Sequence, residues 1–281
     1  MRRINKTWRD ILSFLHDRSW VSIEDIQALF YLNLKYARRV MNEIVKLEYV
    51  KFVQCNLEEN KKGPGRKFYA LTKKGFRQYF SSTDMFSEAK ILTGTGYYHA
   101  HIVNTILTGL LVLSRKYPGL NIESVGEKEM RRICSKLQNK NLVGLSICVP
   151  DFIFRITDGN NSRLYLAEVD ANTETISNDN KYSISIKNKF DGIKNTVSLG
   201  LIETLSEKFS AKLEGFIYLH IAASGLNRIS NIAECVRKLD VPYPVLLVPF
   251  SSIESPESIL RPVWIHANSP NDTKISILEE I

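Results

Sequence analysis

Three acidic residues lie at the ends of two apolar segments near the middle of the chain. Asp151 follows Pro150 and opens the segment Phe-Ile-Phe-Arg-Ile, whereas Glu168 and Asp170 close the segment Arg-Leu-Tyr-Leu-Ala-Glu-Val-Asp. The polar turn 158–160 (Asp-Gly-Asn) between them predicts a β-hairpin. Because the start of one antiparallel strand lies beside the end of its partner, Asp151 is expected near Glu168 and Asp170.

These three carboxylates define a candidate metal site. Side chains alternate across a strand, so Glu168 and Asp170 share one face of the predicted hairpin. Carboxylates that converge repel one another unless a cation or a proton neutralises them. Hard divalent ions such as magnesium and manganese prefer this kind of oxygen ligation. The sequence therefore predicts a magnesium or manganese site built from Asp151, Glu168 and Asp170.

The spacing of Pro150-Asp151 and Glu168-Val169-Asp170 resembles the motif of the PD-(D/E)XK nuclease superfamily. In that superfamily the Asp and the Glu bind the metal, and a Lys two residues after the Glu helps to position the attacking water. Asp170 stands here in the position of that lysine. Its role is then to complete the metal coordination or to orient the water.

The variant Glu-hydrophobic-Asp followed by Thr173-Glu174 resembles the replication-relaxation family of plasmid proteins and the related MobC-type conjugative relaxases, in which the motif lysine is also absent. The resemblance implies that a lysine on the next helix supplies the positive charge. Lys187 and Lys189 are the candidates, and only one of them is expected to face the acids. Thr173 and Glu174 match the family motif, with a supporting role or a helix start as their expected function.

The implied activity is site-specific, metal-dependent nicking of double-stranded DNA at a plasmid origin-type site, in mobilisation, conjugation or replication. Other relaxosome or replication proteins are the implied partners. The alternative is a non-catalytic DNA-binding accessory or replication-control protein whose vestigial nuclease fold only scaffolds a complex.

The positive charge of the chain is concentrated at its N-terminus. Residues 1–80 contain 17 Lys and Arg against 8 Asp and Glu, whereas the remaining residues contain 21 against 22. A small basic module favours binding to a polyanion, because each phosphate contact releases counterions. The alternative interpretation is a solvated, lysine-rich surface that binds nothing. Charge alone does not distinguish the two, so the predicted structure of the region has to.

Residues 1–82 have the pattern of a winged helix-turn-helix domain. Apolar periodicity predicts helices over 7–16, 23–30 and from Asn33 to Glu48, with Ser22 and Asn33 as caps, followed by strands over 49–55 and 67–71. A third helix of this kind enters the major groove of DNA, and the hairpin, or wing, lies along the backbone. The candidate DNA contacts are Lys35, Arg38, Arg39 and Asn42 on the third helix, and Lys61, Lys62, Arg66 and Lys67 on the wing.

The rest of the chain is predicted to be a linker, 83–96, followed by a restriction-endonuclease-like (PD-(D/E)XK) mixed-sheet domain, 97–281. The overall class is therefore α+β or α/β. Helices are expected over 97–117, 128–137, 227–239 and within 180–205, and strands over 143–149, 151–156, 163–169, 215–221 and 244–248. The order helix, three strands, helix, strand is the core order that the nuclease resemblance implies.

A rival metal site is the motif His99-Ala100-His101, which resembles the His-hydrophobe-His motif of other relaxases, with Tyr97, Tyr98 or a distant tyrosine as nucleophile. That motif needs both imidazoles on one face of a strand. The following apolar residues have helical spacing, which would point the two histidines about 200° apart. A capping or core role is therefore favoured, with a secondary role near the active site left open.

Composition narrows the remaining possibilities. The four cysteines have no Cys-x-x-Cys spacing, so neither a zinc site nor a disulfide framework is expected. No signal peptide is visible at the N-terminus, and the most apolar segment, 102–113, is too short to span a bilayer. We therefore expect a cytoplasmic protein that does not insert into membranes.

Overall fold

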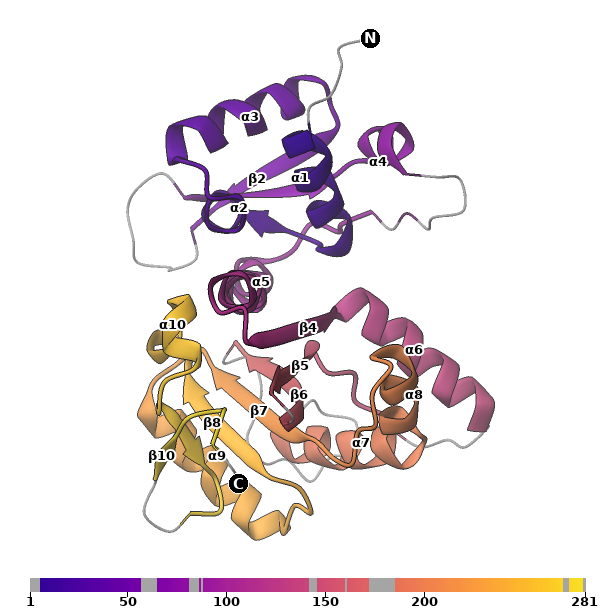
Figure 1. Ribbon diagram of the computed structural model, residues 1–281, viewed down its shortest axis with the longest axis vertical. Coiled ribbons are helices and arrows are strands. Elements are labelled where there is room, and N and C mark those ends of the chain that lie inside the picture. Colours follow the sequence, from indigo (N-terminus) through magenta and orange to yellow (C-terminus); the bar gives the residue numbers. More distant parts are fainter. Residues whose placement is uncertain are drawn as a thin grey trace. The chain divides into compact units, whose positions relative to one another are not determined.

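The computed structural model describes residues 6–56, 65–80, 86, 88–141, 146–159, 161–171, 185–269 and 273–279. The chain divides into two compact units, Met1–Thr108 and Gly109–Ile281, each of which is described by itself (Figure 1). The division falls inside helix α5 (Gly94–Lys116), not in the predicted linker 83–96. The helical period after Tyr97 was recognised in the sequence, but which residues of that helix pack with which unit depends on contacts far along the chain.

The first unit combines helices with a small antiparallel sheet. Its strands have the order β1-β3-β2, and β2 and β3 pair from Val50↔Leu71 to Cys55↔Arg66. The elements are α1 (Lys6–Asp17), β1 (Val21–Ser22), α2 (Ile23–Phe30), α3 (Leu34–Lys46), β2 (Val50–Cys55), β3 (Arg66–Leu71) and α4 (Lys73–Tyr79), followed by the first part of α5. Strand β1 was not predicted, because two residues are too few to show a period.

Side-chain caps fix where α2 and α3 begin. Ser22 Oγ accepts a hydrogen bond from the backbone N–H of Asp25, and the Asp25 carboxylate accepts one from the backbone N–H of Ser22, so the two form a capping box. Asn33 Oδ1 accepts from the Tyr36 N–H at 2.8 Å. Both caps were predicted from sequence, and they set the start of the helix that carries the candidate DNA contacts.

In the described residues of the second unit, seven strands form one mixed sheet in the order β10-β9-β8-β7-β6-β5-β4. Strands β4, β5 and β6 are antiparallel neighbours, whereas β6, β7 and β8 run parallel. The strands are β4 (Leu120–Gly126), β5 (Phe152–Asp158), β6 (Asn161–Asp170), β7 (Ile217–Ala222), β8 (Val245–Pro249), β9 (Trp264–His266) and β10 (Lys274–Ile275). The mixed α and β class of the chain is as predicted.

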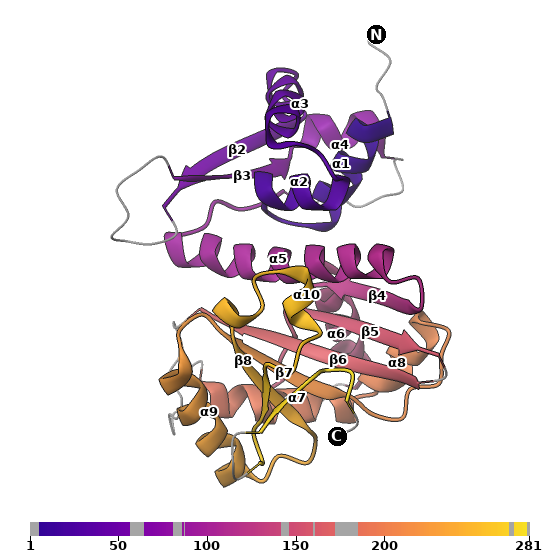
Figure 2. The same ribbon diagram turned by 60° about the vertical axis from the view of Figure 1, so that its left-hand side comes forward.

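Helices α6–α9 supply the apolar side chains that pack on one face of this sheet. A single core cluster joins Met130, Phe190, Leu205 and Val236 to sheet residues such as Leu166. The helices of the unit beyond α5 are α6 (Glu127–Asn141), α7 (Ile186–Ser198), α8 (Leu201–Lys208), α9 (Leu226–Leu239) and α10 (Pro256–Ile259), with a 3-10 turn η1 (Phe250–Ser252) (Figure 2). The described part of the chain contains no helix that is both long and apolar enough to cross a membrane.

Two predictions about this unit are wrong. The described residues 146–149 form no strand, and the strand that precedes the hairpin is β4, which lies before α6. Only two of the seven residues of β4, Ile122 and Val125, are buried, and they lie three positions apart, so the segment lacks the period of two that predicts a strand. The single helix expected within 180–205 is two helices, because Gly200 adopts a left-handed φ of 96° between α7 and α8.

A close backbone approach positions α7. Thr196 Oγ1 donates to the Cys148 carbonyl at 2.9 Å and accepts from the Cys148 N–H at 3.2 Å. At Gly192, one turn earlier, an added Cβ would lie 2.8 Å from Cys148 Cβ and 2.9 Å from its backbone nitrogen. The helix can therefore lie this close to the segment before Pro150 only because residue 192 has no side chain.

We expect Gly192→Ala to lower the free energy of unfolding by about 1–3 kcal/mol, since backbone atoms of Cys148 must shift to admit the methyl group. Gly215→Ala is the matched control, because a Cβ there would meet no atom within 4 Å. Urea denaturation followed by circular dichroism measures both variants. Equal stability of the two would contradict the close approach of α7.

Candidate functional site

The carboxyl end of β6 carries the acidic residues predicted from the hairpin. The register of β5 and β6 ends where Phe152 pairs with Ala167, and Asp151 immediately precedes β5. The Asp151 N–H donates to the Ala167 carbonyl at 3.0 Å, and the Val169 N–H donates to Asp151 Oδ2 at 2.8 Å. These two hydrogen bonds hold Asp151 at the end of the strand pair, against the backbone on either side of Glu168.

Glu168 forms an ion pair with Lys189 of α7 through its Oε1. The pair is largely buried, with side-chain exposures of 5% for Glu168 and 16% for Lys189. Lys187, two residues earlier on α7, instead lies close enough to Cys235 of α9 for its charge to lower the pKa of that thiol, against the larger effect of burial. Lys189 therefore contacts an acid of the hairpin, as one of the two candidate lysines was expected to do.

Asp170 has a different partner. It is fully buried, and its Oδ2 accepts a hydrogen bond from Arg228 Nε of α9 at 2.7 Å, while His220 Nε2 lies 3.7 Å away. Burial alone would raise the pKa of Asp170, but His220 and Arg228 together lower it to about 2. Of the three carboxylates expected to converge, Asp170 therefore belongs to a separate buried ion pair.

Two further polar residues of this face were not predicted. Tyr218 and His220 of β7 pair in parallel with Leu166 and Glu168, and both side chains are fully buried. Burial raises the pKa of Tyr218 well above its usual value, and the charge of Glu168 raises it further, so its hydroxyl stays protonated. The sequence does contain a signal for these two residues, because polar side chains alternate along an otherwise apolar strand. It does not reveal which strand β7 pairs with, so their position beside Glu168 could not be predicted.

The carboxylates of Asp151 and Glu168 suit magnesium better than they suit a metal that is held entirely by protein. Within the described residues, no three His, Cys, Asp or Glu side chains are grouped so that they could hold a metal ion. Magnesium commonly keeps several waters and binds through one or two carboxylates together with substrate phosphates. Asp151 and Glu168 provide a donor set of that kind.

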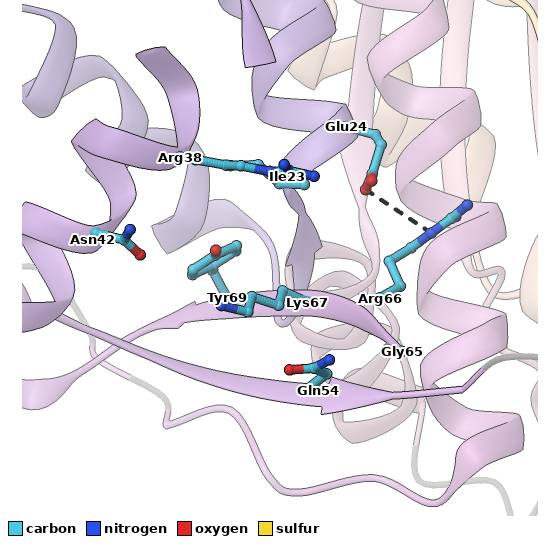
Figure 3. Close-up of a pocket in the computed structure, with 9 residues that line it drawn as sticks. All are labelled: Ile23, Glu24, Arg38, Asn42, Gln54, Gly65, Arg66, Lys67 and Tyr69. Carbon is cyan, nitrogen blue, oxygen red and sulfur yellow. Dashed lines mark ion pairs between the residues drawn. The ribbon is translucent and has the colours of Figure 1, made fainter. Parts of the chain in front are cut away.

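The predicted DNA-contacting side chains of α3 lie on its solvent face. Lys35, Arg38, Arg39 and Asn42 are all exposed, whereas the helix buries Ala37, Val40, Met41 and Ile44. Two of the four, Arg38 and Asn42, also line a pocket against the β2–β3 hairpin, together with Arg66 and Lys67 of β3 (Figure 3). The exposed and buried faces of α3 are therefore the ones predicted from its period.

The rival histidine motif lies on a helix. His99 and His101 belong to α5, so the strand geometry that a His-hydrophobe-His metal site requires is absent at these two residues. His101 accepts a hydrogen bond from Arg66, and burial together with the charge of Arg66 lowers its pKa to about 3. His101 is therefore a neutral imidazole that holds the side chain of Arg66.

Four predicted site residues, Lys61, Lys62, Thr173 and Glu174, lie outside the described residues. Their proposed roles stay predictions.

Comparisons with known proteins identify no family. No protein-family model matches the chain, and no curated protein matches it. Among solved structures, the chain is similar to restriction endonuclease FokI at 12% identity, covering 88% of this chain and 42% of that one, with a TM-score of 0.28. The structure of FokI bound to DNA is likewise similar at 12% identity, covering 88% of this chain and 43% of that one, with a TM-score of 0.25. The chain spans less than half the length of FokI, and similarity at this TM-score carries no argument about function.

The Asp170–Arg228 pair gives a direct test of the buried electrostatics. We expect Arg228→Met to lower the free energy of unfolding by about 3–5 kcal/mol, because it leaves a buried carboxylate without its cation. Lys238→Met on the same helix is the control, since Lys238 and its partner Glu234 are exposed and such pairs contribute little. Thermal denaturation measures both variants, and a loss in Lys238→Met as large as that in Arg228→Met would refute the assignment.

Proposed function

We propose that this protein is a metal-dependent DNA endonuclease that nicks DNA at a specific site. One observation carries the proposal: Asp151 is hydrogen-bonded to the residues on either side of Glu168, and Lys189 reaches Glu168 from the following helix. The spacing of these acids resembles the PD-(D/E)XK motif, and Lys189 supplies the positive charge that the residue after Val169 does not. We also propose that the second unit has a restriction-endonuclease-like fold.

The residues of the site divide the chemistry between them. Bound magnesium or manganese would polarise a phosphate oxygen and lower the pKa of a coordinated water. Asp151 and Glu168 would hold that ion. Lys189 puts a positive charge beside Glu168, where it can stabilise the negative charge that develops on the phosphate. Asp170, paired with Arg228, acts as a positioning residue that ties α9 to the end of β6.

In this proposal the first unit is a winged helix-turn-helix domain that recruits double-stranded DNA. The support comes from the helix order, the antiparallel sheet, and the exposed cations of α3. Arg38 and Asn42 are donors of the kind that read base edges in the major groove, and Lys67 suits a backbone phosphate. The excess positive charge of residues 1–80 strengthens attraction to the polyanion.

The biological setting follows from the sequence resemblance. The variant Glu-Val-Asp motif, with its basic residue moved to the next helix, suggests a relaxase-like role in plasmid mobilisation, conjugation or replication. We accordingly propose action in the cytoplasm on a plasmid origin-type site, in company with other relaxosome or replication proteins.

We expect Asp151→Asn, Glu168→Gln and Lys189→Ala each to slow magnesium-dependent nicking of supercoiled plasmid by about a hundredfold or more. The first two replace a carboxylate that would hold the cation, and the third removes the positive charge beside the phosphate. Lys187→Ala is the matched control on the same helix and should nick at nearly the wild-type rate. A chelator should abolish nicking by the wild type. Agarose gels that separate supercoiled from open-circular plasmid give the rates.

Two outcomes would replace the proposal. Loss of activity in Lys187→Ala but not in Lys189→Ala would show that Lys189 is not the catalytic cation. If the wild type cuts no DNA with magnesium or manganese but still binds it, the protein is the non-catalytic accessory or replication-control factor.

Recognition is tested separately from cleavage. We expect Arg38→Ala to weaken binding to the preferred DNA site by about 1–3 kcal/mol and to relax its sequence preference. Arg77→Ala on α4 removes an exposed cation that does not line the pocket, so it should change affinity much less. Fluorescence anisotropy on selected and scrambled duplexes measures both effects. Equal losses in the two variants would argue against α3 as the recognition helix.

A further inference from the structure

A pocket lies between α3 and the β2–β3 hairpin of the first unit, with a volume of about 490 Å³ (Figure 3). Clefts that take small molecules commonly have volumes of about 300–1,000 Å³, so this one has room for more than a phosphate group. Its walls come from the start of α2, from α3 and from both strands of the hairpin. The lining residues are Ile23, Glu24, Arg38, Asn42, Gln54, Gly65, Arg66, Lys67 and Tyr69.

A paired duplex does not account for a hollow at this position. A recognition helix reads paired bases with side chains that project into the major groove, whereas the stacked bases of a duplex do not enter a hollow beside that helix. The pocket is a concave surface directly beside that helix. The part of a DNA molecule that can fill it is a group that protrudes from the stacked bases.

The lining offers partners for both halves of a nucleotide. Arg38, Arg66 and Lys67 are cations suited to a phosphate. Asn42 and Gln54 carry side-chain amides, each with donors and an acceptor, that can bond the edge of an unpaired base. The side chains from α3 and from the hairpin face each other across the pocket. A site for a phosphate alone would not need the two amides.

One of the cations is held in place before any ligand arrives. Arg66 Nε lies 3.9 Å from a carboxylate oxygen of Glu24, and the guanidinium also donates to His101. Since the pKa of His101 is lowered to about 3, the ring stays neutral and remains an acceptor. Fixing a long side chain in advance reduces the entropy lost on binding.

An aromatic ring is exposed on the same face of the hairpin. Phe52 is 46% exposed, and it pairs in register with Tyr69, while Gln54 pairs with Lys67. Lys67 Nζ lies 5.0 Å from the centre of the Phe52 ring. Exposed aromatic rings beside cations are the platforms on which proteins stack unpaired bases. Without such a partner, the exposed part of the Phe52 ring is apolar surface in contact with water.

We propose that this pocket receives an unpaired nucleotide of DNA, with its phosphate on the cations and its base edge on Asn42 and Gln54. The ring of the base would lie against Phe52, which does not line the pocket but pairs in register with the lining residue Tyr69. The proposal rests on the proposed function of the first unit as a DNA-binding domain. It adds that the substrate is duplex DNA with a locally unpaired base.

The test compares two DNA molecules that differ by one residue. One is a short mixed-sequence duplex, and the other is the same duplex with a single unpaired thymidine in one strand. We expect the full-length protein to bind the bulged duplex about tenfold more tightly, which is the affinity that one stacked base contributes. Fluorescence anisotropy in the presence of a chelator measures binding without cleavage.

Substitutions of Phe52 separate stacking from the flexibility of bulged DNA. Phe52→Leu keeps an apolar side chain without a ring and should remove the preference for the bulge while leaving the affinity for the paired duplex unchanged. Phe52→Trp should retain the preference. Circular dichroism verifies that each variant is folded.

The remaining outcomes have distinct meanings. Equal binding of the two duplexes by the wild type, or a preference that survives in Phe52→Leu, would overturn this inference and leave the proposed function intact. Thymidine monophosphate that competes as strongly as the bulged duplex would also overturn it, because the ligand would then be a free nucleotide. No binding to either duplex would instead refute the DNA-binding function itself.

Discussion

Neutralisation of buried charge is the constraint on which the second unit depends. Strand β6 is buried from Leu164 to its end, yet its last residues include Glu168 and Asp170. An ionised carboxylate without a partner in such a place costs several kcal/mol, so each needs a cation nearby. Lys189 comes from α7 and Arg228 from α9. The same two ion pairs therefore join two helices to the strand and bring positive charge to the end of the sheet.

A related arrangement occurs in the first unit, where a cation is held between two side chains. Arg66 contacts Glu24 at the start of α2 and His101 of α5, and all three belong to the same compact unit. The arginine begins strand β3 and pairs with Cys55, so these contacts also fix the loop end of the hairpin. In both units a charged residue that supports the fold lies where a phosphate could bind, which is why stability and function have to be separated by matched substitutions.

The sequence predicts best what depends on neighbouring residues. Caps, helix periods and the hairpin at Gly159 follow from local rules, so α1–α3, β2–β3 and β5–β6 lie close to the ranges expected. Partners that are distant in the chain were not predictable. The alternation along β6 puts Glu168 and Asp170 on one face, but it does not reveal that α9 carries a cation for Asp170. For the same reason His220, which pairs with Glu168 in a parallel register, was not recognised. Strand β4 was missed because its pattern is irregular, and the pocket beside α3 exists only once helix and hairpin have packed.

The central claim is that Asp151 and Glu168 hold a catalytic cation with Lys189 beside it. The most direct measurement is anomalous diffraction from a crystal of the protein soaked in manganese chloride, since manganese takes oxygen ligands as magnesium does. The account predicts an anomalous peak within bonding distance of the carboxylates of both Asp151 and Glu168. A manganese ion bound at His99 or His101 would contradict it, as would a saturating soak that leaves no peak at these two carboxylates.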